Sequence, residues 1–217
     1  VSEYYGGWVD GGVDPDRILL TTSTSEAYAY LFKLLTDPGD NILTPRPSYP
    51  LFEFLAGMEL LDTIPYSLDF ADLDEQVNSR TRAIIVVNPN NPTGSFLKRH
   101  DLERLIAFCQ KHELAIISDE VFADYGFGDS ATRVPSLTHV HEVLIFSLSG
   151  LSKVAGLPQM KLGWIVGRGP ADRQRYALDR PACTHDTSNR GVHRGQRRRH
   201  TRADTGPRRR GPRSARR

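Results

Sequence analysis

The sequence has few cysteines, no long apolar run and no pattern of a leader peptide in its opening residues. The chain of 217 residues has only two cysteines, Cys109 and Cys183, which excludes a disulfide scaffold. It has no pair of CxxC motifs, so we expect no structural zinc site. We expect no metal. No apolar run reaches the roughly 18 residues that a transmembrane helix needs. The opening residues, VSEYYGGWVDGG, lack the basic and apolar regions of a secretory signal, so we expect a cytoplasmic protein without membrane contact.

The composition is that of a globular protein, with 39% hydrophobic and 25% charged residues. A chain of this length has room for one sizeable domain but not for two large ones. Because it does not begin with Met, we expect it to start within a longer protein. The net charge of +2 is the sum of two opposite contributions, because residues 1–167 have a net charge of −10 and residues 168–217 have a net charge of +12.

Residues 181–217 are rich in arginine, lack periodicity and hold almost no branched aliphatic side chains. Such a segment cannot bury a core, so we expect it to be disordered. Two origins stay open. A genuine basic tail would bind nucleic acid or an acidic surface. A reading-frame error in a GC-rich gene, with its break near Asp179–Cys183, explains better why the segment has arginine without lysine, and nucleic-acid binding is disfavoured.

Seven short runs rich in branched aliphatic residues alternate with helical patterns. The expected strands are Ile18–Thr22, Asn41–Thr44, Leu60–Ile64, Ala83–Asn88, Leu114–Asp119, Val143–Ser147 and Leu162–Val166. The expected helices are Ser25–Thr36, Leu51–Gly57, Leu73–Ser79 and Lys98–His112. This rhythm predicts an α/β fold, a three-layer α/β/α domain with a mainly parallel, doubly wound sheet whose strands lie between helical layers. The last connection is too short for a parallel crossover, so we expect an antiparallel last strand.

Polar residues follow five of the expected strands. Ligands of open α/β sheets bind outside the carboxyl ends of the strands, so these residues are expected to form one site. The segments are Thr21–Glu26, Pro47–Tyr49, Asn90–Gly94, Asp119–Glu120 and Ser147–Lys153. Taken singly, each has an ordinary explanation, such as a helix cap, a core tyrosine, a surface turn or a solvated lysine.

Three of these segments have a physical reason to bind a ligand. Ser23, Thr24 and Ser25 offer hydroxyl and N–H groups at the positive end of a helix dipole, which suits an anion. Asp119 ends a strongly apolar strand, where a carboxylate is costly unless it is paired. Lys153 follows a turn of small residues, so its amine can point into a cleft.

Together, three motifs resemble those of the class I/II aminotransferases, the branch of fold type I pyridoxal-phosphate (PLP) enzymes that includes aspartate aminotransferase. They are NPNNPTG (88–94), ISDEVFADY (117–125) and SLSGLSKVAGLPQMKLGW (147–164), in the family's order and approximate spacing. The resemblance covers residues 1–180 and implies the large, PLP-binding domain, incomplete at its N-terminus. The family's small domain is expected to lie beyond residue 217 and so to be missing here.

The resemblance implies a role for each matching residue. Lys153 matches the lysine that forms a Schiff base with PLP and carries protons during the reaction. Asp119 matches the carboxylate that pairs with the pyridine nitrogen and keeps the ring an electron sink. Asn91 matches the amide on the ring's phenolic oxygen, and Tyr49 the aromatic that stacks on the ring. The expected phosphate contacts are Ser23, Thr24, Ser25 and one of Ser149 and Ser152.

Two positions depart from the family's pattern. Lys161 stands where the family usually has a phosphate-binding arginine, which keeps the charge but loses the bidentate fork. Phe122 stands where a tyrosine commonly donates a hydrogen bond to the phenolic oxygen. The resemblance therefore implies a higher pKa for the Lys153 Schiff base than a tyrosine would give.

The resemblance implies an aminotransferase that moves an amino group from an amino acid to a 2-oxo acid. Another PLP reaction, such as a β-lyase or a decarboxylase, uses the same lysine and aspartate and stays open. So does a truncated, catalytically impaired chain that only binds PLP. A nucleic-acid-binding regulator is disfavoured, because no helix-turn-helix pattern precedes the motifs. The family forms homodimers, and whether this chain can do so stays open, because part of that interface is expected in the missing segments.

Overall fold

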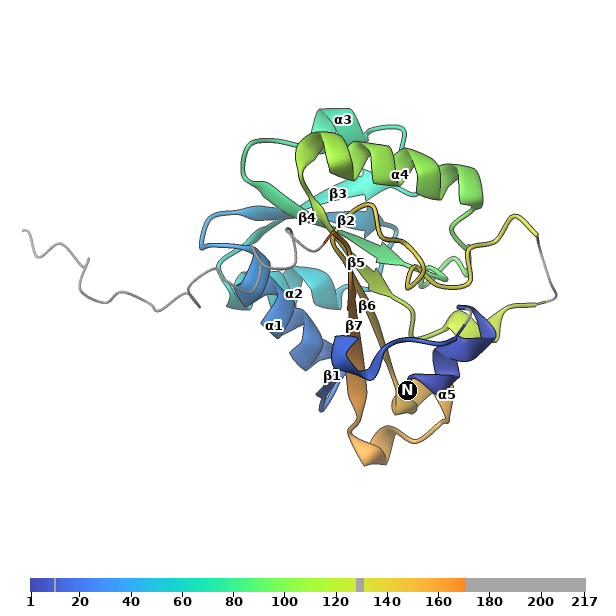
Figure 1. Ribbon diagram of the computed structural model, residues 1–217. Coiled ribbons are helices and arrows are strands. Elements are labelled where there is room, and N and C mark those ends of the chain that lie inside the picture. The colour runs from blue at the N-terminus through green and yellow to red at the C-terminus, as the bar shows by residue number, and fades with distance from the viewer. Residues whose placement is uncertain (10, 128–130, 171–217) are drawn as a thin grey trace, which may run out of the picture. The chain divides into compact units, whose positions relative to one another are not determined.

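The computed structural model describes residues 1–9, 11–127 and 131–170 (Figure 1). The expectations for residues 181–217, and for a break near Asp179–Cys183, lie outside the described residues. Seven strands form one sheet in the order β1-β7-β6-β5-β4-β2-β3. Their bounds are β1 Ile18–Thr21, β2 Asn41–Arg46, β3 Asp62–Ser67, β4 Thr81–Val87, β5 Ala115–Asp119, β6 Ile145–Gly150 and β7 Gly163–Arg168.

All strands of this sheet except β7 run in one direction. β2 pairs in parallel with β3 and β4, and the parallel pairing continues from β4 to β5 and from β5 to β6. β7 pairs antiparallel with both β6 and β1. The expected mainly parallel sheet with an antiparallel last strand is therefore confirmed.

Helices cover both faces of the sheet, as expected for three layers (Figure 1). Side chains of a strand alternate between faces. Ile85 and Ile117 accordingly pack with α1 and α2, whereas Ile84 and Ile116 pack with α3 and α4. The α-helices are α1 Thr24–Leu35, α2 Leu51–Met58, α3 Leu73–Gln76, α4 Arg99–His112 and α5 Leu151–Val154, and the 3₁₀ helices are η1 Glu3–Gly7, η2 Pro15–Arg17, η3 Ala123–Tyr125 and η4 Pro158–Met160.

The N-terminal segment completes the core beside β7. Tyr5 and Trp164 are both buried, and Trp164 Nε1 donates a hydrogen bond to Tyr5 Oη over 3.0 Å. Tyr4 Oη donates to Asp124 Oδ2 over 2.7 Å. The segment before β1 is thus attached to both β7 and η3, the short helix that follows β5.

The expected strand Leu60–Ile64 is displaced towards the C-terminus, and β3 begins at Asp62. Leu60 has a left-handed backbone (φ 59°) and its side chain is 66% exposed, so it belongs to the turn that ends α2. Pro65 lies within β3, where it is tolerated because β3 is an edge strand. The expected helix Leu73–Ser79 also ends early, at Gln76, because Val77 has an extended backbone.

The expectation that the strands lie between helical layers is wrong for β1. Leu19 and Leu20 are 54% and 57% exposed. β1 is an edge strand that pairs only with β7, so its apolar residues are not covered on both sides. Among the described residues, no helix is both long and apolar enough to span a membrane.

Replacing a central residue and an edge residue tests this arrangement. Ile117→Ala removes a fully buried side chain from β5, which should lower the free energy of unfolding by about 2–5 kcal/mol. Leu20→Ala is the control, with an expected change within about 0.5 kcal/mol because the side chain is largely exposed. Denaturant unfolding measures both. Equal losses in the two variants would contradict the edge position of β1.

Candidate functional site

The polar segments after β1, β2, β4, β5 and β6 leave the sheet at the same edge, because these strands run in the same direction. This edge is where open α/β sheets bind ligands. The expectation that the five segments share an edge is therefore confirmed, although each segment contributes differently.

The start of α1 combines a helix cap with an anion-attracting end. Ser23 is the N-cap, and its Oγ accepts a hydrogen bond from the Glu26 N–H over 3.2 Å. The Glu26 carboxylate accepts from the N–H and the hydroxyl of Thr22, and these bonds lower the pKa of Glu26. Thr24 and Ser25 are the first helical residues, whose N–H groups have no partner within any helix. The two interpretations of this segment, an ordinary helix cap and an anion site, are thus compatible with each other.

Two glycines bring the start of α1 against the ends of β6 and β7. A Cβ at Gly163 would lie 3.0 Å from Thr21 Oγ1 and 3.1 Å from the carbonyl carbon of Ser23. A Cβ at Gly150 would lie 3.0 Å from the carbonyl oxygen of Leu162. Larger residues at either position would push these backbones apart. The close approach sets the α1 start beside the segment that carries Lys153.

Asp119 ends β5 on the face covered by α1. Its Oδ2 accepts a hydrogen bond from Tyr28 Oη over 3.0 Å, and its Oδ1 accepts from the Val121 N–H over 3.2 Å. Surrounding protein atoms desolvate the carboxyl and raise its pKa above the ordinary range, while the two hydrogen bonds oppose that shift. The sequence-based expectation that this carboxylate needs partners is met by two donors.

Glu120 points to the other face of the sheet and is 1% exposed. Its carboxylate accepts hydrogen bonds over 2.7–3.0 Å from three hydroxyls and one N–H, those of Ser118, Ser136, Ser147 and Leu137. Burial raises the pKa of Glu120, and these bonds oppose the shift. Glu120 and Ser147 therefore join β5, β6 and the segment around Ser136 from behind the sheet, rather than facing the edge as expected.

The segment after β5 contacts Lys153 at two points. Tyr125 Oη donates a hydrogen bond to the Lys153 carbonyl oxygen over 2.9 Å. The Lys153 Nζ lies 5.3 Å from the centroid of the Phe122 ring, within the range of a cation–π interaction. Lys153 is exposed in the short helix α5, directly after β6. Its amine is thus accessible while its backbone is held.

The three asparagines of the NPNNPTG motif have separate roles. Asn88 is buried, donates to the Val134 carbonyl oxygen and accepts from the Leu97 N–H. Asn90 Nδ2 donates to the Pro47 carbonyl oxygen over 3.2 Å, which joins the loops after β4 and β2. Within the described part of the chain, Asn91 has no hydrogen-bond partner for its half-buried side chain. Only Asn91 is therefore left available for a ligand.

The two candidate serines near Lys153 belong to different elements, Ser149 to β6 and Ser152 to α5. Ser149 pairs across the sheet with Trp164, so its side chain lies on the face that Tyr5 covers, away from α1. Its buried Oγ has no hydrogen-bond partner in the described residues. Ser152 is exposed on α5. Cross-strand pairing thus separates Ser149 from the start of α1.

Tyr28 joins α1 to Asp119, and Phe122 lies beside Lys153, whereas Tyr49 and Lys161 make no comparable contact in the described residues. Tyr49 is 50% exposed in the loop after β2. Lys161 is exposed and has a left-handed backbone (φ 48°) after η4. Neither side chain has a hydrogen bond or ion pair among the described residues. Their participation depends on a ligand that would bring them together.

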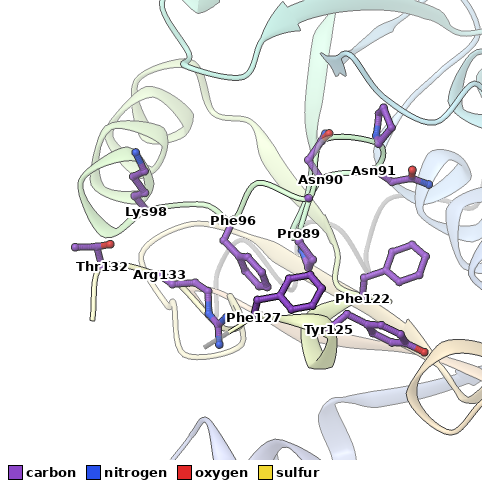
Figure 2. A pocket seen from close by; sticks show the side chains of 12 residues that line it. Pro89, Asn90, Asn91, Phe96, Lys98, Phe122, Tyr125, Phe127, Thr132 and Arg133 are labelled. Carbon is purple, nitrogen blue, oxygen red and sulfur yellow. The ribbon is translucent and has the colours of Figure 1, made fainter. Parts of the chain in front are cut away.

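An open pocket of about 430 Å³ adjoins this region. Figure 2 shows Asn91 and Phe122 at one side of it, and Phe96 and Phe127 near its middle. The Arg133 guanidinium lies 4.4 Å from the centroid of the Phe96 ring. The pocket therefore combines aromatic walls with a cation. Across the described ranges, no group of three or more His, Cys, Asp or Glu side chains could hold a metal ion.

Sequence reasoning missed Tyr28 and Tyr125. Tyr28 lies one helical turn after Thr24, and a buried tyrosine hydroxyl requires a partner, as does a buried carboxyl. The sequence indicates that the hydroxyl of Tyr28 and the carboxyl of Asp119 each need a hydrogen-bond partner, but it does not show that they are each other's partner. Tyr125 belongs to the ISDEVFADY motif, and its bond to a backbone carbonyl has no sequence signal.

The chain matches the model of one protein family, described as aminotransferase class I and II, over residues 4–193. Alanine aminotransferase of Mycobacterium bovis is 31% identical over 167 residues, which are 73% of this chain and 39% of that protein. Tyrosine aminotransferase of Bos taurus is 34% identical over 174 residues, which are 76% of this chain and 38% of that protein. The chain thus spans about two fifths of the length of these curated relatives.

A solved structure shows the same fold. The alanine aminotransferase from Pyrococcus furiosus superposes with a TM-score of 0.72 and 30% sequence identity. The match covers 82% of this chain and 48% of that one. The seven-stranded α/β architecture is therefore that of the aminotransferase fold.

The raised pKa of Asp119 makes a prediction about stability without any ligand. A carboxyl whose pKa is raised by folding stabilises the protein at acidic pH and loses that contribution as the pH rises through its folded-state pKa. Asp119→Asn removes the charge and can still bond Tyr28 and Val121. The variant should therefore gain stability relative to the parent as pH rises above about 4, the ordinary pKa of aspartate.

Urea unfolding of the PLP-free protein across this pH range measures the difference. Asp62→Asn is the control, since its exposed carboxylate stays hydrated in both states. A stability difference between parent and Asp119→Asn that does not change with pH would contradict the assignment of a desolvated carboxyl.

Proposed function

Since the chain belongs to the class I and II aminotransferase family, we propose that it forms the PLP-binding part of an aminotransferase. The reaction proposed is transfer of an amino group from an amino acid to a 2-oxo acid. PLP, the proposed cofactor, supplies an aldehyde that combines with amines and a ring that accepts electrons from the bonds beside the amine carbon. The protein must hold the ring, supply a lysine that reacts with the aldehyde, and move protons.

The observation that carries the proposal is that α1 links an anion-attracting end to a carboxylate. The start of the helix is suited to an anion, and Tyr28, four residues after Thr24, donates a hydrogen bond to the Asp119 carboxylate. PLP carries a phosphate and a ring nitrogen at separate points of one small molecule. An anion site and a carboxylate that both contact the same helix suit these two groups.

Asp119 would accept a hydrogen bond from the protonated ring nitrogen. Burial disfavours the lone carboxylate, and a nearby positive charge favours it, so the pairing would reverse the raised pKa of Asp119. Asn91, which has no hydrogen-bond partner among the described residues, would donate to the phenolic oxygen. Tyr49 would stack on the ring face, for which its exposed side chain has freedom to move.

The phosphate would be held by the start of α1 and by nearby side chains. Thr24 and Ser25 offer hydroxyls and helix-terminal N–H groups, with Ser23 beside them as the cap. Of the two candidate serines, Ser152 fits better than Ser149, because Ser149 faces away from α1. Lys161 would supply a positive charge on its flexible side chain.

Lys153 would attach PLP covalently through its amine and later hold and move the proton at the amine carbon. Phe122 would pack beside this amine without supplying a hydroxyl. The residues assigned above bind or react with PLP, and none of them is assigned to the carboxylate of a substrate. A second candidate is therefore a chain that binds PLP but does not turn over substrate.

Reductive labelling tests the cofactor assignment. The protein is mixed with PLP, reduced with borohydride, digested and analysed by mass spectrometry. The expected product is a phosphopyridoxyl group on Lys153, absent in Lys153→Ala and unchanged in the control Lys98→Ala. Labelling scattered over several lysines would contradict the proposal. Labelling of Lys153 without formation of a 2-oxo acid from any amino acid would favour the PLP-binding candidate.

Phe122→Tyr tests the proposed ring contacts. A tyrosine hydroxyl would donate to the phenolic oxygen and stabilise its negative charge, so the pH midpoint of the bound cofactor's absorbance should fall. A spectrophotometric pH titration of parent and variant measures that midpoint. Tyr125→Phe serves as the control, because the hydroxyl of Tyr125 contacts a backbone carbonyl. An unchanged midpoint in Phe122→Tyr would count against the placement of the ring beside Phe122.

A further inference from the structure

Tyr28 lies in the second turn of α1 with its ring in the core. The side chain is 2% exposed, and its ring centroid lies 5.8 Å from that of Phe32 and 5.3 Å from that of Phe52. Rings packed in this way have little freedom to turn. The position of the Tyr28 hydroxyl is therefore fixed by the packing of α1 and α2.

That hydroxyl is one of two donors to the Asp119 carboxylate, and the donors come from different elements. Val121 belongs to the loop that follows Asp119, so its N–H moves with the carboxylate. Tyr28 belongs to α1, ninety-one residues earlier in the chain. Of these two hydrogen bonds, only the one from Tyr28 therefore fixes the orientation of the carboxylate relative to α1.

We propose that Tyr28 is a positioning residue, which holds the Asp119 carboxylate in the orientation that receives the ring nitrogen of PLP. The inference rests on the proposed function, because only a bound ring gives Asp119 a nitrogen to receive. α1 would then set both ends of the cofactor, the phosphate through its first residues and the ring nitrogen through Tyr28. Small movements of the β5 loop relative to α1 would be suppressed.

Packing alone does not account for the hydroxyl. A phenylalanine would fill the same space among Phe32 and Phe52 without a polar atom that needs a partner. Tyr66 offers the comparison within the same chain. It is equally buried, at 1% exposed, but its Oη donates to the Ile85 carbonyl oxygen over 2.8 Å and, among the described residues, makes no hydrogen bond to a carboxylate. Tyr28 and Tyr66 thus form a matched pair that differs in the acceptor.

The first test uses the PLP-free protein. Carbon-13 NMR follows the titration of the Asp119 carboxyl in the parent, in Tyr28→Phe and in Tyr66→Phe. Because the Tyr28 hydroxyl stabilises the charged form, its removal should raise the pKa of Asp119, whereas Tyr66→Phe should leave it unchanged. An Asp119 pKa unchanged by Tyr28→Phe would overturn the proposal.

A second variant keeps this test decisive if Tyr28→Phe folds poorly. Difluorotyrosine introduced at position 28 keeps the ring and makes its hydroxyl a stronger donor. It should shift the pKa of Asp119 in the opposite direction to phenylalanine. A shift in the same direction as phenylalanine would show that disturbed packing, and not the hydrogen bond, governs the carboxyl.

The second test separates orientation from general damage. PLP is compared with its 1-deaza analogue, which lacks the ring nitrogen and so cannot pair with Asp119. Tyr28→Phe should weaken binding of PLP by roughly tenfold, the scale of one hydrogen bond to a charged group, and leave binding of the analogue unchanged. Equal weakening of both ligands would mean a merely structural role and overturn the proposal.

The outcomes also distinguish this proposal from the proposed function. A parent protein that binds PLP and the analogue equally well would remove the assigned pairing with Asp119, and with it both proposals. A parent that prefers PLP, with the same preference retained in Tyr28→Phe, would leave the proposed function intact and overturn only the role of Tyr28.

Discussion

Parallel strand pairing is the constraint on which the rest of the structure depends. β1, β2, β4, β5 and β6 run in one direction, so the segments after them leave the sheet at a single edge. Residues as far apart in the sequence as Tyr28 and Asp119 meet there within hydrogen-bond distance. The antiparallel β7 contributes in another way. It follows the segment that begins with α5 and Lys153, and it places Gly163 against the start of α1.

At this edge, two neighbouring residues have different roles: Glu120 stabilises the sheet, whereas Asp119 is available to a ligand. Asp119 and Glu120 are adjacent in sequence but point to opposite faces of the sheet. Glu120 is enclosed by four donors and joins β5 and β6 from behind. Asp119 has two donors and remains partly accessible on the α1 side. The buried hydrogen bonds of Glu120 on one face of the sheet thus fix the ends of β5 and β6. The Asp119 carboxylate extends from the same end of β5 on the other face.

Much of the fold follows from local sequence. The apolar runs of Ala83–Asn88 and Leu114–Asp119 could be recognised as central strands, because a strand buried on both faces has no polar alternation. The antiparallel β7 could be recognised from its short connection. The start of β3 could not, because the left-handed backbone of Leu60 depends on how α2 ends, and the exposure of Leu19 and Leu20 depends on strand order.

The candidate site was predictable as a set of motifs, but not as a set of contacts. The motifs located Asp119, Lys153 and the start of α1, whereas the partner of Asp119 comes from a distant helix. The position of Ser149 on the same face as Trp164 follows from the cross-strand register, which the sequence alone does not show. Likewise, only the hydrogen bonds of Asn88 and Asn90 distinguish these two residues from Asn91.

We propose that this edge of the sheet binds PLP with its ring nitrogen against Asp119. Nitrogen-15 NMR of the protein loaded with PLP labelled at that nitrogen tests this pairing. The expected chemical shift is that of a protonated, hydrogen-bonded nitrogen at neutral pH, and it should be lost in Asp119→Asn. A bound PLP whose nitrogen is unprotonated, or whose signal is the same in Asp119→Asn, would show that Asp119 does not pair with the ring.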